Sequence, residues 1–519
     1  MSDKSNSDRQ KEVIAFLSQP ESYGRDVEKV QRIDTHISVV FLAGDRVYKM
    51  KRAVQFEYLD YGTLARRRTF CEAEIETNRR TAPSLYLGVV AVTRAEDGAL
   101  HLNGDGEPVE WLVEMGRFDQ ESLFDRMAEA GTLTPELMTG LADSIHRFHD
   151  EADPVRDRGG AAIMRHILDG NFQEIRKSTP SLFDSGKAAL LEERSRAALD
   201  SLAGLLDTRG REGRVRQCHG DLHLRNICLV DGVPTLFDGI EFNDDISVID
   251  VLYDLAFLLM DLEHRGHRDR ANEVFNRYLA LGDDVAGLAA LPLFMACRAA
   301  IRAHTTVAAA RAQPERATRG PLEAEACSYL DLACSFLEPF TPALVAIGGL
   351  SGTGKSTVAG KIAPALGRAP GALVLRSDVI RKRLFGVAPE TRLDSAAYTR
   401  AVSDRVYAFI GEQAAVGLKA GQSVIADAVF ARETERTAIE TVGRDAGVEV
   451  TGVWLEAPGA VLENRVASRR NDASDADPAV VKAQLTYDLG VMNWHRIDAG
   501  DGADQTAASA ANVIARKAS

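Results

Sequence analysis

Hydrophobic and polar residues alternate through the first part of the chain in the pattern of short β-strands. Ala43, Gly44 and Asp45 separate two of these strands, and this spacing predicts a hairpin. The predicted elements are strands over 37–42, 46–51, 85–92 and 109–115 and helices over 11–17 and 66–80. The region therefore predicts a small antiparallel sheet with a helix beside it.

The pattern changes after residue 122, where helical periodicity dominates as far as residue 337. Short strands over 217–230 and 235–237 interrupt it around a loop, and 248–262 is an apolar helix. Residues 338–342 (Glu-Pro-Phe-Thr-Pro) then form a rigid joint.

Beyond the joint, buried-type strands alternate with helices, which is typical of a parallel α/β sheet. The predicted strands cover 343–347, 372–375, 423–425 and 449–455, with a further strand near Trp494, and a final helix falls within 498–519. Two domains are expected, 1–338 and 339–519, because 519 residues exceed one hydrophobic core.

The composition of the chain argues against several classes of partner. The formal charge of −14 argues against an extended nucleic-acid surface, although it leaves room for a local basic channel. Six cysteines without a CxxC pair indicate reduced thiols in a cytoplasmic protein. The polar N-terminus is not a signal peptide, and the apolar runs are shorter than a membrane span, so no membrane partner is expected.

The segment 349–356 matches the P-loop pattern at every fixed position, with a predicted strand before it and a helix after it. Its glycines allow backbone N–H groups to face phosphate oxygens. Lys355 would supply charge to the β- and γ-phosphates, and the Ser356 hydroxyl would bind Mg²⁺. The predicted nucleotide contacts are Gly349, Ser351, Gly352, Thr353, Gly354, Lys355, Ser356 and Thr357.

A second phosphate-handling signature lies in the N-terminal half. Asp221 and Asn226 have the spacing of a kinase catalytic loop, in which the Asp accepts the acceptor's proton and the Asn holds magnesium. His219 stands two residues before the Asp, and Asp238 follows the next short strand as a second magnesium ligand. These residues resemble the H-G-D-x-x-x-x-N loop of the aminoglycoside phosphotransferase and choline kinase branch of the kinase superfamily.

That resemblance implies an ATP-anchoring lysine on a strand and a glutamate partner on a helix. Lys49 and Lys51 share one strand face, and Lys49 is preferred. Glu74 is the expected partner, with Glu72 or a simply solvated helix face as alternatives. Met115 lies where the resemblance implies the hinge that contacts adenine.

An acidic stretch follows Asp238. It comprises Glu241, Asp244, Asp245, Asp250 and Asp254. In aminoglycoside kinases such acids attract a cationic substrate, and here the stretch could equally anchor the catalytic loop.

The C-terminal half resembles the small P-loop kinases that phosphorylate hydroxyls, a group that includes polynucleotide kinase, chloramphenicol phosphotransferase and the zeta toxins. In Ser377-Asp378-Val379-Ile380-Arg381 the resemblance implies that Asp378 is the general base and Arg381 a substrate clamp. The alternative for Asp378 is a helix N-cap. Asp427, after the third strand, would lie near magnesium or substrate, or would form a turn.

The same resemblance extends to arginines. Arg432 and Arg436 share one helix face. The resemblance implies that at least one of them faces the acceptor, and the alternative is a solvated face. Arg465 and Arg469 would belong to a lid that closes over the phosphates, where guanidinium groups stabilise the moving charge. The alternative is a salt-bridged helix.

Together these features predict an α+β, two-lobed protein-kinase-like domain, with lobes over about 30–115 and about 116–338, followed by an α/β P-loop kinase domain with a parallel sheet. The predicted activity is transfer of the γ-phosphoryl group of ATP or GTP, with Mg²⁺, to small-molecule hydroxyls at two sites. One alternative is a single active kinase with a regulatory nucleotide-binding domain. Another is a polynucleotide or toxin-like kinase in the C-terminal half.

Overall fold

The computed structural model describes residues 2–24, 26–56, 59–468 and 473–517. The chain divides into two compact units, one of Met1–Gly159 with Gly210–Leu255 and the other of Gly160–Arg209 with Ala256–Ser519. The expected boundary between residues 338 and 339 stays a prediction.

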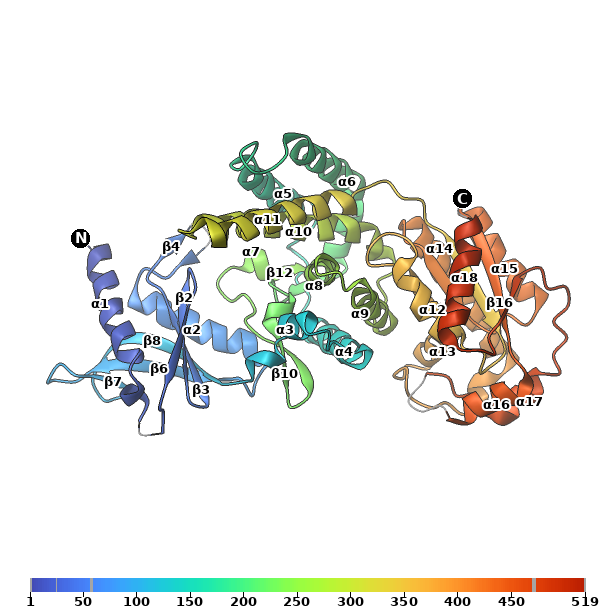
Figure 1. Cartoon of the computed structure of the whole chain (residues 1–519), viewed down its shortest axis with the longest axis horizontal. Helices are drawn as coiled ribbons and strands as arrows, with labels where there is room; N and C mark the ends of the chain where they lie inside the picture. Colours follow the sequence, from blue (N-terminus) through green and yellow to red (C-terminus); the bar gives the residue numbers. More distant parts are fainter. Residues whose placement is uncertain (1, 25, 57–58, 469–472, 518–519) are drawn as a thin grey trace. The chain divides into compact units, whose positions relative to one another are not determined.

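An antiparallel six-stranded sheet dominates the first unit, in the order β1-β2-β3-β8-β6-β7 (Figure 1). Its strands are β1 (Val30–Asp34), β2 (Ser38–Ala43), β3 (Arg46–Lys51), β6 (Tyr86–Arg94), β7 (Leu100–Leu102) and β8 (Glu107–Gly116). The predicted hairpin is confirmed, since β2 pairs with β3 and Val40 lies opposite Lys49. Helix α2 (Leu64–Arg79) packs against β6 and β8.

The remainder of this unit consists of short strands and helices around a central loop. The strands are β4 (Gln55–Phe56), β5 (Leu59–Asp60), β9 (Val215–Gln217), β10 (Ile227–Val230), β11 (Val233–Leu236) and β12 (Val248–Asp250). The helices are α1 (Ser2–Leu17), η1 (Pro20–Tyr23), η2 (Gln120–Ser122), α3 (Phe124–Glu129), α4 (Pro135–Glu151), η3 (Leu224–Asn226) and α7 (Asp244–Ser247). Strand β9 pairs with β12, and β10 pairs with β11. The loop between β9 and β10 carries the predicted catalytic residues.

Long helices form one part of the second unit. They are α5 (Ala161–Arg176), α6 (Ser185–Arg211), α8 (Val251–His264), α9 (Arg268–Leu281), η4 (Ala286–Ala290), α10 (Leu291–Arg311) and α11 (Arg316–Phe336). The stretch Ala286–Arg311 is long and apolar enough to cross a membrane, but 78% of its most apolar window is buried within the protein. Because α10 packs against α5 and α11, this burial is that of a core helix.

A parallel five-stranded sheet forms the other part, in the order β14-β15-β13-β16-β17. Its strands are β13 (Leu344–Gly349), β14 (Leu373–Arg376), β15 (Val424–Asp427), β16 (Val450–Glu456) and β17 (His495–Asp498). The helices are α12 (Lys355–Ile362), η5 (Ala363–Ala365), α13 (Ser377–Leu384), η6 (Ser395–Tyr398), α14 (Arg400–Lys419), α15 (Glu433–Asp445), α16 (Gly459–Ser468), α17 (Pro478–Gln484) and α18 (Ala503–Lys517). The predicted parallel sheet is confirmed.

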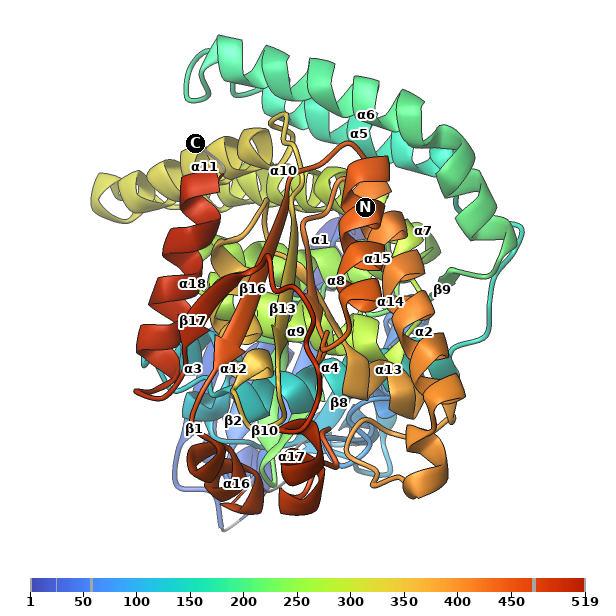
Figure 2. The same ribbon diagram turned by 90° about the vertical axis from the view of Figure 1, so that its right-hand side faces the viewer.

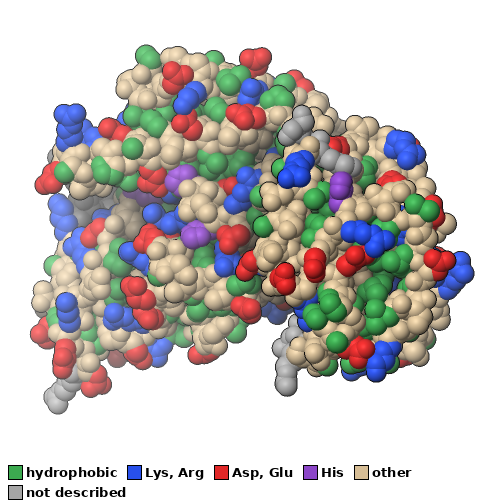
Figure 3. All heavy atoms as spheres, turned by 45° about the vertical axis from the view of Figure 1, so that its right-hand side comes forward, with side chains coloured by type: hydrophobic (Ala, Val, Ile, Leu, Met, Phe, Trp, Pro, Cys, Tyr) green, Lys and Arg blue, Asp and Glu red, His purple; other side chains and the backbone are tan. Residues whose placement is uncertain are grey.

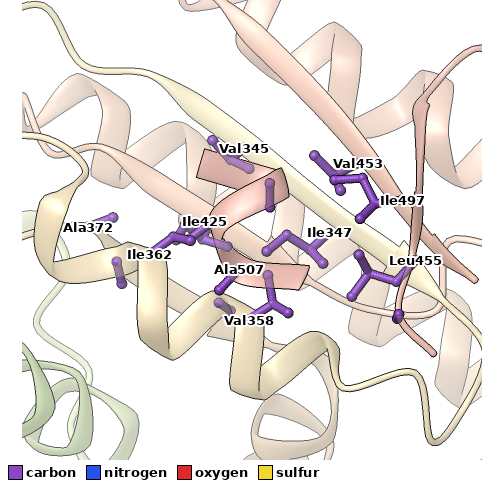
Figure 4. Close-up of a cluster of buried hydrophobic side chains, with 14 residues drawn as sticks. Val345, Ile347, Val358, Ile362, Ala372, Ile425, Val453, Leu455, Ile497 and Ala507 are labelled. Atoms are coloured by element: carbon purple, nitrogen blue, oxygen red, sulfur yellow. The ribbon is translucent and has the colours of Figure 1, made fainter. Parts of the chain in front are cut away.

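Helices cover both faces of this sheet. In Figure 2, α12 and α18 lie on one side and α14 and α15 on the other. On the α12 side, Val345, Ile347 and Ile425 of the strands pack against Val358 and Ala507 of the helices (Figure 4). This core fixes the ends of β13 and β15, where the P-loop and Asp427 begin the site.

Candidate active sites

In the first unit, a buried ion-pair cluster links β3, α2 and the segment after β11. Lys49 Nζ lies 2.8 Å from Glu74 Oε1 and 2.5 Å from Asp238 Oδ1. Burial alone would lower the pKa of Lys49, but the charges of Asp238 and Glu74 outweigh it and raise that pKa well above its usual value. The structure therefore brings together the predicted lysine, its glutamate and the predicted metal ligand.

The second lysine of β3 binds the other oxygen of the same glutamate. Lys51 Nζ lies 2.6 Å from Glu74 Oε2, 2.5 Å from Glu241 Oε1 and 3.2 Å from the Tyr61 hydroxyl. Its side chain is 1% exposed, against 16% for Lys49. Lys49 is thus the more open of the two and the one that contacts Asp238, while the choice of ATP anchor between them stays a prediction.

The catalytic loop is held by backbone hydrogen bonds to one buried carboxylate. Asp254 accepts hydrogen bonds from the backbone N–H groups of His219 (3.1 Å) and Gly220 (2.9 Å), and His149 Nε2 lies 3.1 Å from it. Gly220 has φ of +81°, and a Cβ there would lie 3.0 Å from the Ile246 carbonyl oxygen. Of the two open interpretations, the position of Asp254 supports loop anchoring.

Within the loop, the side chains of Asp221 and Asn226 meet. Asn226 Nδ2 donates to Asp221 Oδ2 at 3.0 Å and to its backbone carbonyl at 3.0 Å. His223 Nε2 lies 3.3 Å from Asp221 Oδ2. The ring of His219 is buried, with Nε2 2.9 Å from the Phe237 carbonyl, and this burial lowers its pKa. The neutral ring packs the loop against the strand that leads to Asp238.

Asp238 occupies a backbone conformation that few non-glycine residues adopt, with φ of +60°. Its N–H donates to the Tyr86 hydroxyl at 3.0 Å, and the next N–H, of Gly239, donates to Asn78 Oδ1 at 2.7 Å. Residues of α2 and β6 therefore fix the direction of this carboxylate. Met115 is the last residue but one of β8, an inner strand of the sheet, and it pairs with Val47 of β3 and Tyr86 of β6. Its role at the adenine hinge stays a prediction.

In the second unit, the P-loop joins β13 to α12 in the expected context. Gly352 and Gly354 have φ of +88° and +87°, which turn successive N–H groups toward one point. A Cβ on Gly352 would lie 2.7 Å from the Leu462 carbonyl oxygen, so α16 approaches the loop closely. The Ser351 N–H donates to Gln484 Oε1 at 2.7 Å, and Lys355 Nζ to the Leu350 carbonyl at 3.1 Å.

The P-loop serine and the acid that ends β15 are in direct contact. Ser356 Oγ donates to Asp427 Oδ2 at 2.5 Å, and Asp427 is 3% exposed. Arg376 Nε lies 3.7 Å from the same carboxylate oxygen. A hydroxyl and a carboxylate are the oxygen donors that Mg²⁺ prefers, so this pair fits the predicted metal site.

Asp378 lines a cavity of about 790 Å³ together with Gly354, Lys355, Ser356 and Asp427. Burial, followed by the charge of Asp427, raises the pKa of Asp378. The N-cap interpretation is wrong, because α13 begins at Ser377 and its N-cap is Arg376. The carboxylate lies in the first helical turn and is free to face the cavity.

The predicted arginines separate into two groups. Arg381 and Arg432 line the cavity. Arg381 donates from Nη1 to the Ala397 carbonyl at 2.7 Å and stacks over the Tyr398 ring, while Arg432 lies 3.4 Å from Asp404.

The other predicted arginines serve the scaffold or fall outside the described residues. Arg436 is 3% exposed and donates to four backbone carbonyls, of Phe430, Ala431, Leu489 and Val491. Arg436 therefore faces neither the cavity nor solvent, and of the two arginines only Arg432 lines the cavity, which is compatible with the expectation that at least one of them faces the acceptor. Arg465 donates to the carbonyls of Ala499 (2.8 Å) and Gly500 (3.2 Å) and is not among the cavity-lining residues. Arg469 lies outside the described residues.

Sequence reasoning missed several residues that shape these sites. Tyr61, Asn78 and Tyr86 hold the first site, and Ser474 and Asp475 line the second. None belongs to a spaced motif, because each acts through a partner far away in the chain. Ser474 and Asp475 lie in the sequence segment that was expected to form the lid, but nothing in the sequence singled them out from the other polar residues there.

Two family models match separate parts of the chain. The phosphotransferase enzyme family matches residues 71–294, and an AAA domain family matches residues 344–487. These matches cover the catalytic loop in one case and the P-loop in the other. The chain therefore contains a kinase-like phosphotransferase domain followed by a P-loop domain, as the resemblances implied.

One relative spans nearly the whole chain. An uncharacterised protein of Mycobacterium tuberculosis is 29% identical over 488 residues, which is 92% of this chain and 94% of the relative. The similarity therefore extends over both parts of this chain that the family models match.

Each of the similar solved structures covers only part of this chain. A choline/ethanolamine kinase family protein from Mesorhizobium loti covers 63% of this chain and 99% of its own, at 13% identity and a TM-score of 0.40. A gluconokinase from Sinorhizobium meliloti covers 34% of this chain and 94% of its own, at 22% identity and a TM-score of 0.26.

Proposed function

We propose that the phosphotransferase-family region and the P-loop region are two ATP- and Mg²⁺-dependent kinase sites, each of which phosphorylates a hydroxyl of a small molecule. The observation that carries the proposal is the completeness of each site. Lys49 contacts both Glu74 and Asp238 in one, and Ser356 contacts Asp427 in the cavity that holds Asp378 in the other.

At the first site, Asp221 orients the acceptor hydroxyl and takes its proton. Asn226 and Asp238 supply oxygen donors for magnesium, and Lys49 holds the phosphates while Glu74 fixes its position. The Asn226–Asp221 hydrogen bond keeps the base in one rotamer. The bound ion would neutralise charge on the phosphates.

At the second site, the P-loop N–H groups and Lys355 hold the β- and γ-phosphates. Ser356 and Asp427 would hold the magnesium ion. Asp378 takes the acceptor's proton, and its raised pKa makes it a stronger base than an ordinary carboxylate. Arg381 and Arg432 line the acceptor side. Positioning and charge neutralisation carry the rate at both sites.

The nucleotide is ATP or GTP, and the cytoplasm is the expected location, consistent with six cysteines that are all free thiols. Small molecules are favoured over nucleic acid as acceptors. The net charge is −14, and on the face in Figure 3 acidic and basic side chains are interspersed among the described residues.

The test is a screen of metabolite extracts for phosphate transfer from labelled ATP, read by mass spectrometry. The Asp221→Asn and Lys355→Ala variants each remove one site. We expect each variant to lose a different product or one step of a sequence. A variant that keeps all product formation would show that its site does not catalyse the detected reactions, which would favour a regulatory nucleotide-binding role.

A polynucleotide or toxin-like kinase in the C-terminal half is the second candidate, and it rests on the resemblance of 377–381 to that group. The full chain carrying Asp221→Asn would be incubated with labelled ATP and oligonucleotides. Efficient labelling of the ends would replace the small-molecule proposal for the second site.

A further inference from the structure

A serine of the protein itself occupies the acceptor side of the second site. Ser474 lines the cavity that also contains Lys355, Ser356 and Asp378, and its hydroxyl is hydrogen-bonded to the Asp378 carboxylate. An acceptor hydroxyl must make this same contact with a general base before it attacks a phosphoryl group. The serine hydroxyl therefore stands where the proposed function requires the hydroxyl of a substrate.

The residues on either side fix Ser474 in this place. Asp475 Oδ2 accepts hydrogen bonds from the Tyr398 hydroxyl (2.5 Å) and the Leu393 N–H (3.0 Å), and it also binds the Lys382 ammonium. These three partners come from α13 and from the segment that follows it, on the acceptor side of the cavity. The lysine and the tyrosine hold the pKa of Asp475 below its usual value, so its charge persists at neutral pH.

Apolar contacts hold the same segment against the P-loop. Ala473 is 6% exposed, and Ala476 packs with Leu350 of the P-loop against a small core of Leu462 and Val466. The serine is thus held from both sides, with its hydroxyl directed at the base. A surface loop without such anchors would hold its serine in this position for only part of the time.

Resting on the proposed kinase activity of the P-loop site, we propose that Ser474 is an autophosphorylation site of this chain. With MgATP bound and no small acceptor present, Ser474 Oγ attacks the γ-phosphorus. Its proton passes to the Asp378 carboxylate, the new Oγ–P bond forms, and the bond to the β,γ-bridging oxygen breaks with release of ADP. The product is a phosphoserine in the acceptor position, which blocks the site to a substrate.

The environment of the base supports this chemistry. Partial burial and the nearby negative charge of Asp427 both raise the pKa of Asp378, which favours acceptance of a proton. Lys355 and Arg376 lie close enough to act on the same carboxylate, so the cationic groups that would stabilise a transferring phosphoryl group are in place.

The test uses the full-length protein with MgATP and no added acceptor, followed by intact-mass and peptide mass spectrometry. We expect one added phosphoryl group on Ser474 in the wild type. Ser474→Ala and Lys355→Ala should abolish it, and Asp378→Asn should slow it at least tenfold. Ser474→Thr keeps a hydroxyl and should yield phosphothreonine. If the threonine variant is labelled and the alanine variant is not, the missing hydroxyl explains the loss, and misfolding does not.

Two controls separate the sources of the phosphate. Ser468→Ala removes a serine hydroxyl from α16, where it is bonded to the Arg465 carbonyl outside the cavity lining, and should leave labelling unchanged. Asp221→Asn inactivates the first site, so phosphate on Ser474 in that variant comes from the P-loop site.

Calorimetric titration of the Asp221→Asn variant with MgATP distinguishes the two possible failures. If nucleotide binds and Lys355→Ala abolishes that binding, but no phosphate reaches Ser474, the autophosphorylation proposal is overturned while the kinase proposal stands. If MgATP does not bind the P-loop at all, both are overturned. Phosphate on another residue in place of Ser474 also rejects the proposal.

Discussion

Glu74 is shared by two buried lysines, and its side chain is 0% exposed. Burial raises the pKa of this carboxyl, but the charges of Lys49 and Lys51 outweigh burial and lower it below its usual value of 4.5. Replacing Glu74 by glutamine removes the negative charge that both buried ammonium groups, of Lys49 and Lys51, share. We expect Glu74→Gln to lower the free energy of unfolding by about 3 kcal/mol at neutral pH, measured by urea denaturation.

The pH dependence has a defined sign. A carboxyl whose pKa is lowered on folding contributes stability above its unfolded pKa and loses it as the pH falls. The difference between wild type and Glu74→Gln should be constant above about pH 5 and shrink below about pH 4.5. Glu72→Gln is the matched control, since Glu72 lies on the same helix, is 52% exposed and pairs with Arg68; its effect should stay within about 0.5 kcal/mol. An equal loss in both variants would contradict the buried-pair account.

The two lysines of β3 offer a second test at this scale. Lys49 contacts the predicted metal ligand Asp238, whereas Lys51 is enclosed by Glu74, Glu241 and Tyr61. In a Lys355→Ala background, which removes the P-loop site, Lys49→Met should weaken MgATP binding at least tenfold by calorimetry. Lys51→Met should chiefly lower the melting temperature. The opposite pattern would make Lys51 the ATP anchor.

Single residues were predictable where the chemistry is local in sequence. The P-loop and the pair Asp221 and Asn226 could be recognised because short spacings determine which atoms meet. Two of the four carbonyls that Arg436 contacts, and both of those that Arg465 contacts, are 34 to 55 residues away, and no spacing rule points to them. Arginine at helical spacing is compatible with a lid, a salt bridge or a backbone clamp, and tertiary packing decides among them.

At the scale of elements, side chains of α9 take the place of a further strand at the outer edge of β14, where they form hydrogen bonds with backbone N–H and C=O groups. Asn276 of α9 accepts from the Val374 N–H at 2.7 Å and donates to the Ala372 carbonyl at 3.1 Å, and Asn272 donates to the same carbonyl. An unpaired edge would leave these groups to water or to another chain. Helix α9 thus replaces a sixth strand, immediately before the turn that carries Asp378.

Removing the hydrogen bonds between Asn276 and β14 should make this strand open more often. We expect Asn276→Ala to cost about 1–2 kcal/mol and to speed hydrogen exchange of the Val374 amide at least tenfold, measured by mass spectrometry on peptides covering 373–376. Asn464→Ala, the same change at an exposed position of α16, should leave the exchange unchanged. Unchanged protection in Asn276→Ala would mean that α9 does not close this edge.

Periodicity predicted most elements of the structure, including the five parallel strands. The reason is that each buried strand appears in the sequence as a short apolar run between two helical segments. The alternative role of Asp378 as an N-cap placed the start of the following helix at Val379, whereas α13 starts at Ser377. Helix starts depend on the local backbone as well as on the capping residue. The N-cap is Arg376, two residues before Asp378, so Asp378 lies in the first turn, where its carboxylate can face the cavity.

For the whole molecule, the sequence predicted two kinds of fold in tandem but not which helices complete the parallel sheet. The helix α9 belongs, by sequence order, to the phosphotransferase-family match over 71–294, yet its side chains bind β14 of the P-loop sheet. Arg268 of the same helix donates to the Gly367 carbonyl at 2.7 Å, and Arg277 lies 2.6 Å from Glu390. Such contacts join residues about 100 positions apart, so no local pattern reports them.

A fragment cut at the proline-bearing joint, residues 339–519, should therefore lack part of its own structure. Without α9, the β14 edge is open, and we expect faster hydrogen exchange over 373–376 than in the full chain, together with association at higher concentration in light scattering. Strand β15 is an internal control, because β13 and β14 pair with it on both sides, and its amides over 424–427 should exchange equally slowly in both proteins. A monomeric fragment with full protection at β14 would show that the P-loop domain is complete from residue 339, and that the α9 contacts join two finished domains instead of building one.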